Sequence, residues 1–372
     1  MRITWFSWKD INHPRAGGAE QVSNEIRKRL VADGHEVTLI TAHYPGAKHA
    51  EIVDGVKVLR SGGHITVYLR AQRAYKTLPP QDILIDEMNT IPFMVTFYKK
   101  NIPTVLLTYQ LARQVWFYQM FFPLSLIGYL LEPLYLRVMS KRYDLVLTES
   151  LSTKKDLVRF GFRPSDIEVF RIGLGKSQQK QDPKSAKKIT GQVVFLGAFR
   201  PMKRPIDAIK AFEYAHAQNP NLKLVLAGNN HGPYGEKVAH YVAQSAHSQA
   251  ITLKGRVSEA EKSKLLQESQ VIVVTSIKEG WGLIVTEANS QGTPAVVYGA
   301  DGLRDSVTNE VTGKVVESGN TEALGQAIIG LLANTKELSR LSRAAFEDSK
   351  QYTFNTSYQD FKKAIQKKIN LS

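Results

Sequence analysis

Two glutamates eight positions apart, Glu279 and Glu287, are the strongest candidates for chemistry in this sequence. The first opens the segment Glu279-Gly280-Trp281-Gly282-Leu283, which follows an apolar run, Val271–Thr275, and leads into a predicted helix over Leu283–Gln291. N–H groups at a helix start attract anions, and glycines let a phosphate or a sugar approach the backbone. Carboxylates repel a phosphate but accept hydrogen bonds from vicinal hydroxyls. The pattern favours a phosphate between two hydroxyl-bearing groups, such as a sugar and a ribose; helix capping by Glu279 and a solvated Glu287 are the alternative.

A second candidate is a basic run. Arg200, Lys203 and Arg204 come shortly after the apolar run Val193–Leu196. Cations at the end of a strand can neutralise a diphosphate leaving group. Such a run is also common on a solvated surface, but its position directly after a predicted strand favours the functional interpretation.

A third candidate is the glycine turn Arg15-Ala16-Gly17-Gly18-Ala19-Glu20, which joins the first predicted strand to a helix over Ala19–Ala32. A glycine turn at a helix start is a favourable place for an anion. Its spacing fits neither the dinucleotide-binding fingerprint nor the P-loop. An ordinary turn remains the alternative interpretation of this segment.

The elements that must position these residues follow one pattern twice: a short apolar run, a polar loop and a helical periodicity. Several runs consist of Val, Ile and Leu without polar alternation, as in parallel strands buried on both faces. The sequence therefore predicts an α/β protein with two doubly wound, Rossmann-like domains that face a central cleft. The predicted strands are Arg2–Phe6, Glu36–Thr41, Val56–Arg60, Asp82–Asp86, Thr104–Tyr109, Asp144–Thr148, Glu168–Ile172, Val193–Leu196, Lys223–Ala227, Ile251–Lys254, Val271–Thr275 and Ala295–Val297.

Composition suggests where the domains meet. Residues 176–191 are rich in Gln, Lys, Ser, Asp and Pro and are expected to form a linker. It would separate a first domain over 1–175 from a second over 192–353. Residues 354–372 have helical periodicity and no following strand, so they are expected to form a terminal helix, with packing back on the first domain as one option.

Charge and composition exclude several classes of function. The 372 residues include 49 Lys and Arg against 34 Asp and Glu, a net charge of +15, which favours anionic partners. The absence of cysteine excludes disulfides and thiolate zinc sites. No Asp-x-Asp or HExxH motif occurs, so no metal site is expected. The amino terminus lacks the apolar core of a secretory signal, and we expect the mature protein to begin at Met1, in the cytoplasm.

One stretch differs from the rest of the sequence. Gln114–Leu131 carries no charge and is crowded with aromatic residues, which brings it to the lower limit for a membrane span. Gln119, Pro123 and Gly128 argue against a span. A buried or interdomain helix and a surface facing a membrane or acceptor remain open; flanking cations suit contact with anionic lipid at the inner face of the plasma membrane.

These motifs together resemble retaining glycosyltransferases of family 4, which have the two-domain GT-B fold. The resemblance spans nearly the whole chain, and its specific part is the Glu279-x7-Glu287 element. The supporting motifs are Gly17-Gly18-Ala19-Glu20, Gly34-His35-Glu36-Val37, Gly197–Lys203, Gly292-Thr293-Pro294 and Thr312-Gly313.

The resemblance implies that the first domain lies on the acceptor side and that the second binds the nucleotide-sugar. It also implies a role for each candidate. Glu279 would hold the donor sugar, Glu287 its ribose, and Arg200 and Lys203 the diphosphate, with Glu279, Arg200 and Lys203 as the catalytic set. The chain departs from the family at Ala198, where arginine is usual, and at Tyr109, where histidine commonly ends the strand. The substrate-binding candidates are Gly17, Gly18, Tyr109, Arg256, Gly280, Trp281, Gly282, Leu283 and Glu287.

The function that follows is metal-independent transfer of a hexosyl group from a nucleotide-sugar to an acceptor hydroxyl, with retention of anomeric configuration. No cofactor is implied, since the nucleotide-sugar is a co-substrate. The acceptor would be a glycan or a lipid-linked precursor. A non-catalytic nucleotide-sugar-binding homologue is the main alternative, motivated by Tyr109 and Ala198. A nucleic-acid binder would explain the charge, but no recognition motif supports it, and no nucleic-acid partner is expected.

Overall fold

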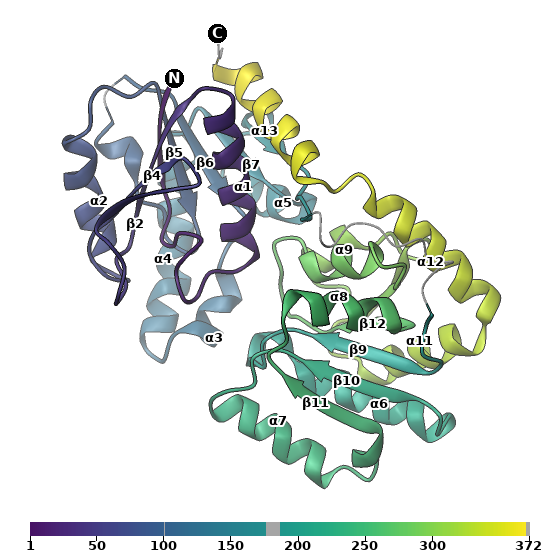
Figure 1. Ribbon diagram of the computed structural model, residues 1–372. Coiled ribbons are helices and arrows are strands. Elements are labelled where there is room, and N and C mark those ends of the chain that lie inside the picture. The colour runs from purple at the N-terminus through teal and green to yellow at the C-terminus, as the bar shows by residue number, and fades with distance from the viewer. Residues whose placement is uncertain (100, 176–186, 370–372) are drawn as a thin grey trace. The chain divides into compact units, whose positions relative to one another are not determined.

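The computed structural model describes residues 1–99, 101–175 and 187–369 (Figure 1). The chain divides into two compact units. The first comprises Met1–Gly173 together with Phe354–Ser372, and the second comprises Leu174–Thr353. Most of the expected linker, residues 176–186, lies outside the described residues.

The first unit is built on an eight-stranded sheet in the order β3-β4-β2-β1-β5-β6-β7-β8. All neighbouring strands are parallel except β3 and β4. Its strands are β1 (Arg2–Phe6), β2 (Glu36–Thr41), β3 (Ala50–Val53), β4 (Val56–Arg60), β5 (Ile83–Met88), β6 (Thr104–Thr108), β7 (Leu145–Thr148) and β8 (Ile167–Val169). Its helices are α1 (Gly18–Ala32), α2 (Val67–Lys76), α3 (Trp116–Gln119), α4 (Leu124–Met139), α5 (Leu151–Arg159) and α13 (Phe354–Ile369).

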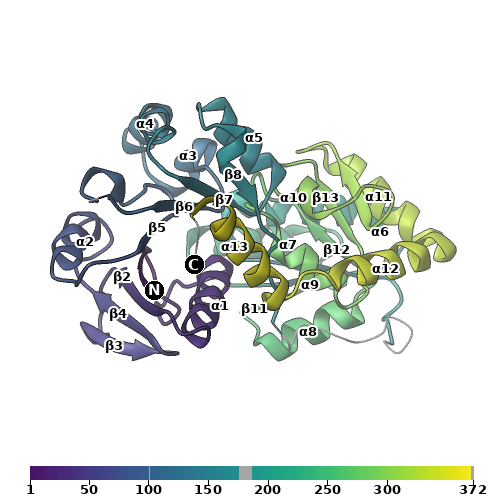
Figure 2. The same cartoon turned by 90° about the horizontal axis from the view of Figure 1, so that it is seen from above.

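Successive residues of β1 face opposite sides of this sheet, and their contacts show which helices pack on each face. The Trp5 ring stacks on Phe361 of α13, with centroids 5.9 Å apart. The next side chain, Phe6, packs against Tyr75 of α2 and Phe93. Helices therefore lie on both faces, with α1 and α13 side by side (Figure 2). Phe361 and Ile365 are buried, so the last helix contributes to the core of the first unit.

The second unit is built on a six-stranded parallel sheet in the order β11-β10-β9-β12-β13-β14. Buried residues form one apolar cluster on each face of it. Its strands are β9 (Gln192–Leu196), β10 (Lys223–Ala227), β11 (Ile251–Gly255), β12 (Val271–Val274), β13 (Ala295–Tyr298) and β14 (Gly313–Val316). Its helices are α6 (Pro205–Gln218), α7 (Pro233–Gln244), α8 (Glu259–Glu268), α9 (Leu283–Asn289), α10 (Leu303–Ser306), α11 (Thr321–Ala333) and α12 (Thr335–Ser349).

The expectation of two doubly wound α/β domains is confirmed. Most predicted strands agree with the structure to within one or two residues at each end. Two edge strands, β3 and β14, were not predicted. Both are short and carry polar or partly exposed residues, so they lack the continuous apolar pattern of central strands.

The aromatic stretch forms α3 and the first half of α4, with a 3₁₀ turn, Arg113–Val115, before them. Within the described residues, no helix combines the length and apolar character that a membrane crossing requires. Trp116 is buried, whereas most of the aromatic and leucine side chains that follow it are exposed.

Candidate functional site

The site in the second unit lies where the strand order reverses. From β9 the chain adds β10 and β11 on one side, and then returns to place β12 on the other side of β9. Loops that leave the carboxyl ends of such a pair diverge and create the usual ligand-binding position of an open α/β sheet. Lys203 follows β9 and Glu279 follows β12, so the topology brings these two candidates to one position.

Hydrogen bonds tie these two loops together. The Thr275 hydroxyl oxygen lies 2.8 Å from the backbone carbonyl oxygens of both Lys203 and Arg204, which share its single O–H donor. The Ile277 N–H donates to the Met202 carbonyl at 3.0 Å. Because Thr275 is fully buried, these bonds are shielded from competing water. The segment carrying Lys203 therefore has a defined position relative to the segment carrying Glu279.

The first glutamate is paired with a lysine. Lys203 Nζ contacts Glu279 Oε1 as a hydrogen-bonded ion pair, and the two side chains are 28% and 17% exposed. The pair can therefore reach a ligand without being immersed in solvent. A lysine ammonium and a glutamate carboxylate in contact offer both donors for phosphate oxygens and acceptors for sugar hydroxyls.

The second glutamate is paired in the same way. Glu287 lies in α9, and its Oε1 accepts a hydrogen bond from Lys262 Nζ of α8 at 3.0 Å. Lys262 also contacts Glu259 at 2.7 Å, and these acidic neighbours raise its pKa against the opposing effect of burial. Glu287 is 9% exposed, so it is not a solvated surface residue. Sequence analysis did not identify Lys262, because a lysine in a charged helix has no distinguishing spacing.

Glycine geometry shapes the segment between the two glutamates. Gly282 precedes α9 with φ +93°, a conformation that side chains rarely adopt. Gly302 has φ +80°, and a Cβ there would lie 2.3 Å from the Glu279 carbonyl oxygen. The Glu279 N–H donates to the Asp301 carbonyl at 2.9 Å. The backbone of Glu279 is thus held directly against the loop that follows β13.

The remaining candidates of the second unit have different surroundings. The Trp281 indole donates to Thr286 Oγ1 at 2.8 Å and packs on Tyr352, with ring centroids 5.4 Å apart. Gly280 and Leu283 belong to the same segment, next to Glu279 and at the start of α9.

The two arginine candidates lie in other loops. Arg200 is exposed, at the start of the 3₁₀ turn that contains Lys203. Arg256 is exposed directly after β11, the edge strand two positions from β9.

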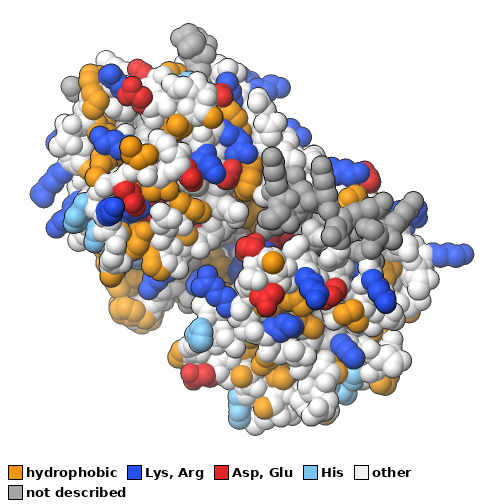
Figure 3. Space-filling model, in the orientation of Figure 1, with side chains coloured by type: hydrophobic (Ala, Val, Ile, Leu, Met, Phe, Trp, Pro, Cys, Tyr) orange, Lys and Arg blue, Asp and Glu red, His pale blue; other side chains and the backbone are white. Residues whose placement is uncertain are grey.

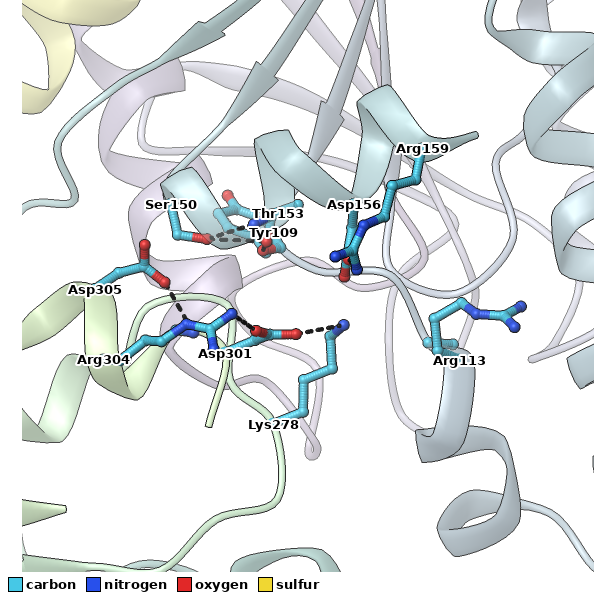
Figure 4. A network of polar contacts seen from close by, with 12 residues as sticks. Tyr109, Arg113, Ser150, Thr153, Asp156, Arg159, Lys278, Asp301, Arg304 and Asp305 are labelled. Carbon is cyan, nitrogen blue, oxygen red and sulfur yellow. Dashed lines mark hydrogen bonds and ion pairs between the residues drawn. The ribbon is translucent and has the colours of Figure 1, made fainter. Parts of the chain in front are cut away.

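A further cluster lies beside Glu279. Lys278 is 2% exposed and donates to Asp301 Oδ2 at 3.4 Å, and Arg304 pairs with the other oxygen of Asp301 (Figure 4). Asp301 is also the residue whose carbonyl accepts from the Glu279 N–H. These side chains therefore support the position of Glu279. Sequence reasoning missed them because they come from two loops that only the fold brings together.

The glycine turn of the first unit is held by one buried carboxylate. Glu20 Oε2 accepts from the Gly17 N–H at 2.7 Å, and Oε1 pairs with Lys9 Nζ at 2.9 Å. Lys9 also donates to the Arg15 carbonyl at 2.9 Å. Gly17 is exposed and Gly18 is half-buried at the start of α1. The turn is therefore an ordered segment at the carboxyl end of β1.

Tyr109 lies directly under this turn. It is 7% exposed, its hydroxyl oxygen is 2.5 Å from Ser23 Oγ, and it donates to the Ala19 carbonyl at 3.2 Å. Its own carbonyl accepts from Thr153 Oγ1 at 3.0 Å (Figure 4). Burial raises the pKa of Tyr109 well above its usual value. The phenol is thus occupied inside the fold, where it supports the first turn of α1.

Among the described residues, no group of three or more His, Asp or Glu side chains is arranged to hold a metal ion. The charged groups at the carboxyl end of the β9–β12 pair are instead the two lysine–glutamate pairs and the neighbouring cations.

Two protein families match the chain, one in each unit. The model described as "Glycosyltransferase Family 4" matches residues 16–174, and that described as "Glycosyl transferases group 1" matches residues 177–348. This chain belongs to glycosyltransferase family 4. The first match contains the Gly17 turn and Tyr109, and the second contains Lys203 and both glutamates.

Solved structures show that this glycosyltransferase has the GT-B fold. Sucrose-phosphate synthase from Thermosynechococcus elongatus superposes with a TM-score of 0.81 at 17% identity, covering 100% of both chains. Anabaena HepE in complex with UDP and glucose has a TM-score of 0.75 at 16% identity, covering 99% of this chain and 100% of its own.

Curated relatives match over part of their length. The poly(glycerol-phosphate) α-glucosyltransferase of Bacillus subtilis is 32% identical over 163 residues, 44% of this chain and 24% of that protein. A D-inositol 3-phosphate glycosyltransferase of Mycolicibacterium paratuberculosis is 29% identical over 191 residues, 50% of this chain and 40% of that protein. The chain thus spans between a quarter and two fifths of the length of these relatives.

Proposed function

We propose that this family 4 glycosyltransferase transfers a hexosyl group from a nucleoside diphosphate sugar to an acceptor hydroxyl, with retention of anomeric configuration. The observation that carries the proposal is the pairing of both glutamates with lysines beside the strand-order reversal of the second unit. A diphosphate needs cations and a sugar or ribose needs acceptors, and each pair supplies one of each.

The pairs also explain how a dianionic ligand could bind beside carboxylates. Without a ligand, Lys203 neutralises Glu279 and Lys262 neutralises Glu287. When the diphosphate binds, Lys203 can turn to its oxygens, and Glu279 is left to accept hydrogen bonds from the sugar hydroxyls. Glu287 would accept from the ribose. Arg200, exposed beside Lys203, would add a second cation for the leaving group.

The proposed reaction is a front-side displacement. The bond between the anomeric carbon and the phosphate oxygen breaks, and its electron pair remains on the diphosphate. The acceptor oxygen bonds to the same face of the anomeric carbon, and its proton passes to the departing phosphate oxygen. Lys203 and Arg200 stabilise the charge that develops there, and such stabilisation is usually the largest contribution to the rate. The Gly17 turn, with Tyr109 beneath it, would belong to the acceptor side.

The names of related proteins suggest which substrates to examine first. HepE was solved with UDP and glucose, and the two curated relatives are named for a polyol phosphate polymer and an inositol phosphate. We propose a UDP-sugar donor and an acceptor that is a glycan or lipid-linked precursor. We also propose a location in the cytoplasm or peripherally at the inner face of the plasma membrane, which agrees with the absence of cysteine, since this fits a reducing compartment.

The test is a product analysis with UDP-, GDP- and ADP-sugars as donors, with mass spectrometry for the product and NMR for its anomeric configuration. We expect one donor to give product with retained configuration, and Glu279→Ala to lower kcat. Lys350→Ala, which removes an exposed lysine from the pair with Glu347, is the matched control and should leave kcat unchanged. Inverted product would refute retention, and donor binding without transfer or hydrolysis would favour the non-catalytic binding homologue.

A further inference from the structure

The α3–α4 segment exposes an unusually large amount of apolar surface. Phe121 and Phe122 are 72% and 75% exposed, and Leu130, Leu131 and Leu134 of α4 are each more than half exposed. With Val138, these residues form what we call the α3–α4 surface. Isolated exposed leucines are normal, but a contiguous apolar patch marks an interaction site. In Figure 3 hydrophobic side chains gather at the end of the first unit where the ribbon of Figure 1 places α3.

The buried face of α4 combines two polar residues, Ser125 and Glu132, with the apolar Leu136 and Met139. Glu132 is fully buried, and its carboxylate accepts from the N–H groups of Ala112 and Arg113, at 2.8 and 2.6 Å, and from the Trp116 indole at 3.0 Å. Ser125 is also buried. A soluble helix normally turns such residues to water and its leucines to the core. Here the contacts of Glu132 hold an acid inside, and of the leucines of α4 only Leu136 is buried with it.

The orientation is further defined by close packing between the two helices. A Cβ on Gly128 would lie 2.5 Å from the Trp116 ring, so the absence of a side chain there lets α3 lie directly against α4. The Arg113 guanidinium stacks on the Tyr129 ring at 4.3 Å. The exposed leucines therefore belong to a packed structure that is already formed without a partner.

Within Arg113–Tyr143 the charges at the surface are all positive, and the exposed acid just beyond this stretch, Asp144, is paired with Lys99. Between Arg113 and Tyr143 the sequence has a single acid, the buried Glu132. Arg137, Lys141 and Arg142 are exposed at the end of α4 and just beyond it. Arg142 lies 4.3 Å over the ring of Phe97, which is itself 53% exposed. The surface thus combines apolar side chains with a border of cations and carries no exposed carboxylate over this stretch.

We propose that the α3–α4 surface docks on an anionic lipid bilayer, with its leucines and phenylalanines in the acyl region and its cations at the headgroups. A bilayer supplies an apolar layer and a negative surface together, which matches both features. A second copy of this chain fits less well, because an isologous contact would bring the same cations of both copies together. The inference goes beyond the proposed transfer reaction and does not depend on it.

The experiment is flotation of the full chain with vesicles of phosphatidylcholine alone or with 30% phosphatidylglycerol, at low and high salt. We expect at least tenfold stronger binding to the anionic vesicles at low salt, and a smaller difference at high salt because salt screens exposed charges. No binding of the wild-type chain to anionic vesicles at low salt would overturn the proposal.

Two variants separate the apolar and ionic contributions. Leu130→Glu with Leu134→Glu should lower binding at least tenfold at both salt concentrations. Arg137→Glu with Lys141→Glu should lower it mainly at low salt, since each cation near an anionic surface contributes about fivefold. Ile52→Glu with Val311→Glu, which changes exposed residues elsewhere, is the matched control and should bind as wild type.

The remaining outcomes are also decisive. Circular dichroism and donor binding would show that each variant is folded, independently of transfer activity. Equal vesicle binding by the leucine variant would overturn the proposal. So would a wild-type dimer in light scattering that the leucine variant converts to monomer without any vesicle binding, because the partner would then be a second copy. Loss of transfer with vesicle binding intact would contradict only the proposed function.

Discussion

Each unit carries a cation–glutamate pair near its strand-order reversal, and the two pairs differ in burial. In the first unit, Arg27 of α1 lies 3.7 Å from Glu87 of β5, and both side chains are completely buried. In the second unit, Lys203 contacts Glu279, and both side chains are partly exposed. The first pair is enclosed by Trp5, whose indole donates to Glu87 at 2.6 Å. An enclosed pair can affect only the stability of the fold. In a pair that reaches solvent, each side chain can release the other and bind a ligand instead.

The largest effect is expected on removing one member of the buried pair. At pH 8 and above, where the Glu87 carboxyl is ionised, Arg27→Met should lower the free energy of unfolding of the first unit by about 3–5 kcal/mol, because it removes the buried cation that faces this carboxylate. Native-state hydrogen exchange of β1 and β5 measures this. The double variant Arg27→Met with Glu87→Leu removes both charges and should recover much of the loss. A single variant as stable as wild type would show that the pair is not ionised.

The exposed pair should behave oppositely. Lys203→Ala should cost less than about 1 kcal/mol of stability, as exposed ion pairs do. It should lower kcat/KM by roughly 10- to 150-fold, because a charged hydrogen bond to the leaving group contributes about 1.5–3 kcal/mol. Steady-state kinetics and thermal unfolding provide the two measurements. Unchanged kinetics in the double variant of Lys203 and Arg200 would identify this basic run as ordinary surface.

The buried pair should also make the first unit sensitive to pH. Burial raises the pKa of Glu87 from 4.5 to about 7, so the folded chain binds a proton in this range that the unfolded chain has lost. Its contribution to stability is therefore present below pH 4.5 and is lost as pH rises to about 7, with a slope of at most about 1.4 kcal/mol per pH unit. Urea unfolding of Glu87→Gln should lose this contribution and keep the one from Asp86, whose pKa burial raises from 3.8 to about 6. An identical pH dependence in the variant would contradict the assignment.

A smaller effect is expected at the second glutamate of the exposed site. Glu287→Ala should raise the donor KM roughly tenfold and change kcat little, because a ribose contact is similar in ground and transition states. Glu279→Ala should lower kcat as well, because the sugar it contacts carries the reacting carbon. Isothermal titration with the nucleoside diphosphate separates the loss of binding expected for Glu287→Ala from the loss of turnover expected for Glu279→Ala. Wild-type transfer rates in both variants would show that this segment is not the donor site.

The smallest effect is expected at Tyr109. Tyr109→Phe removes the hydroxyl that contacts Ser23 and the Ala19 carbonyl, a change of about 0.5–1.5 kcal/mol in stability for a neutral hydrogen bond. Because this phenol is turned into the fold, kcat should change less than twofold. A large loss of kcat with stability retained would show instead that the hydroxyl reaches a substrate.

The central strands were predictable because they are buried on both faces. Val271–Val274 and Val193–Leu196 are unbroken apolar runs, and such runs are typical of parallel strands. The edge strands β3 and β14 were not predictable in this way, since one side of an edge strand has no partner to bury and tolerates polar residues. The glutamate-glycine segment was recognisable for a local reason, since the glycine at position 282 adopts a positive φ that few other residues tolerate.

By itself, the sequence determined the repeated α/β alternation, the position of the candidate donor segment and the family, because these depend on patterns local in the chain. Only the tertiary structure decided which charged side chains contact one another. It paired Glu287 with Lys262, enclosed Arg27 with Glu87, and turned Glu132 inward while most leucines of α4 stay exposed. Each of these depends on residues 16 to 60 positions apart, and such distances are closed only when sheets and helices pack. The same type of charged residue can therefore lie on the surface, in the core or in a candidate site, and its burial by the fold determines which of these roles it has.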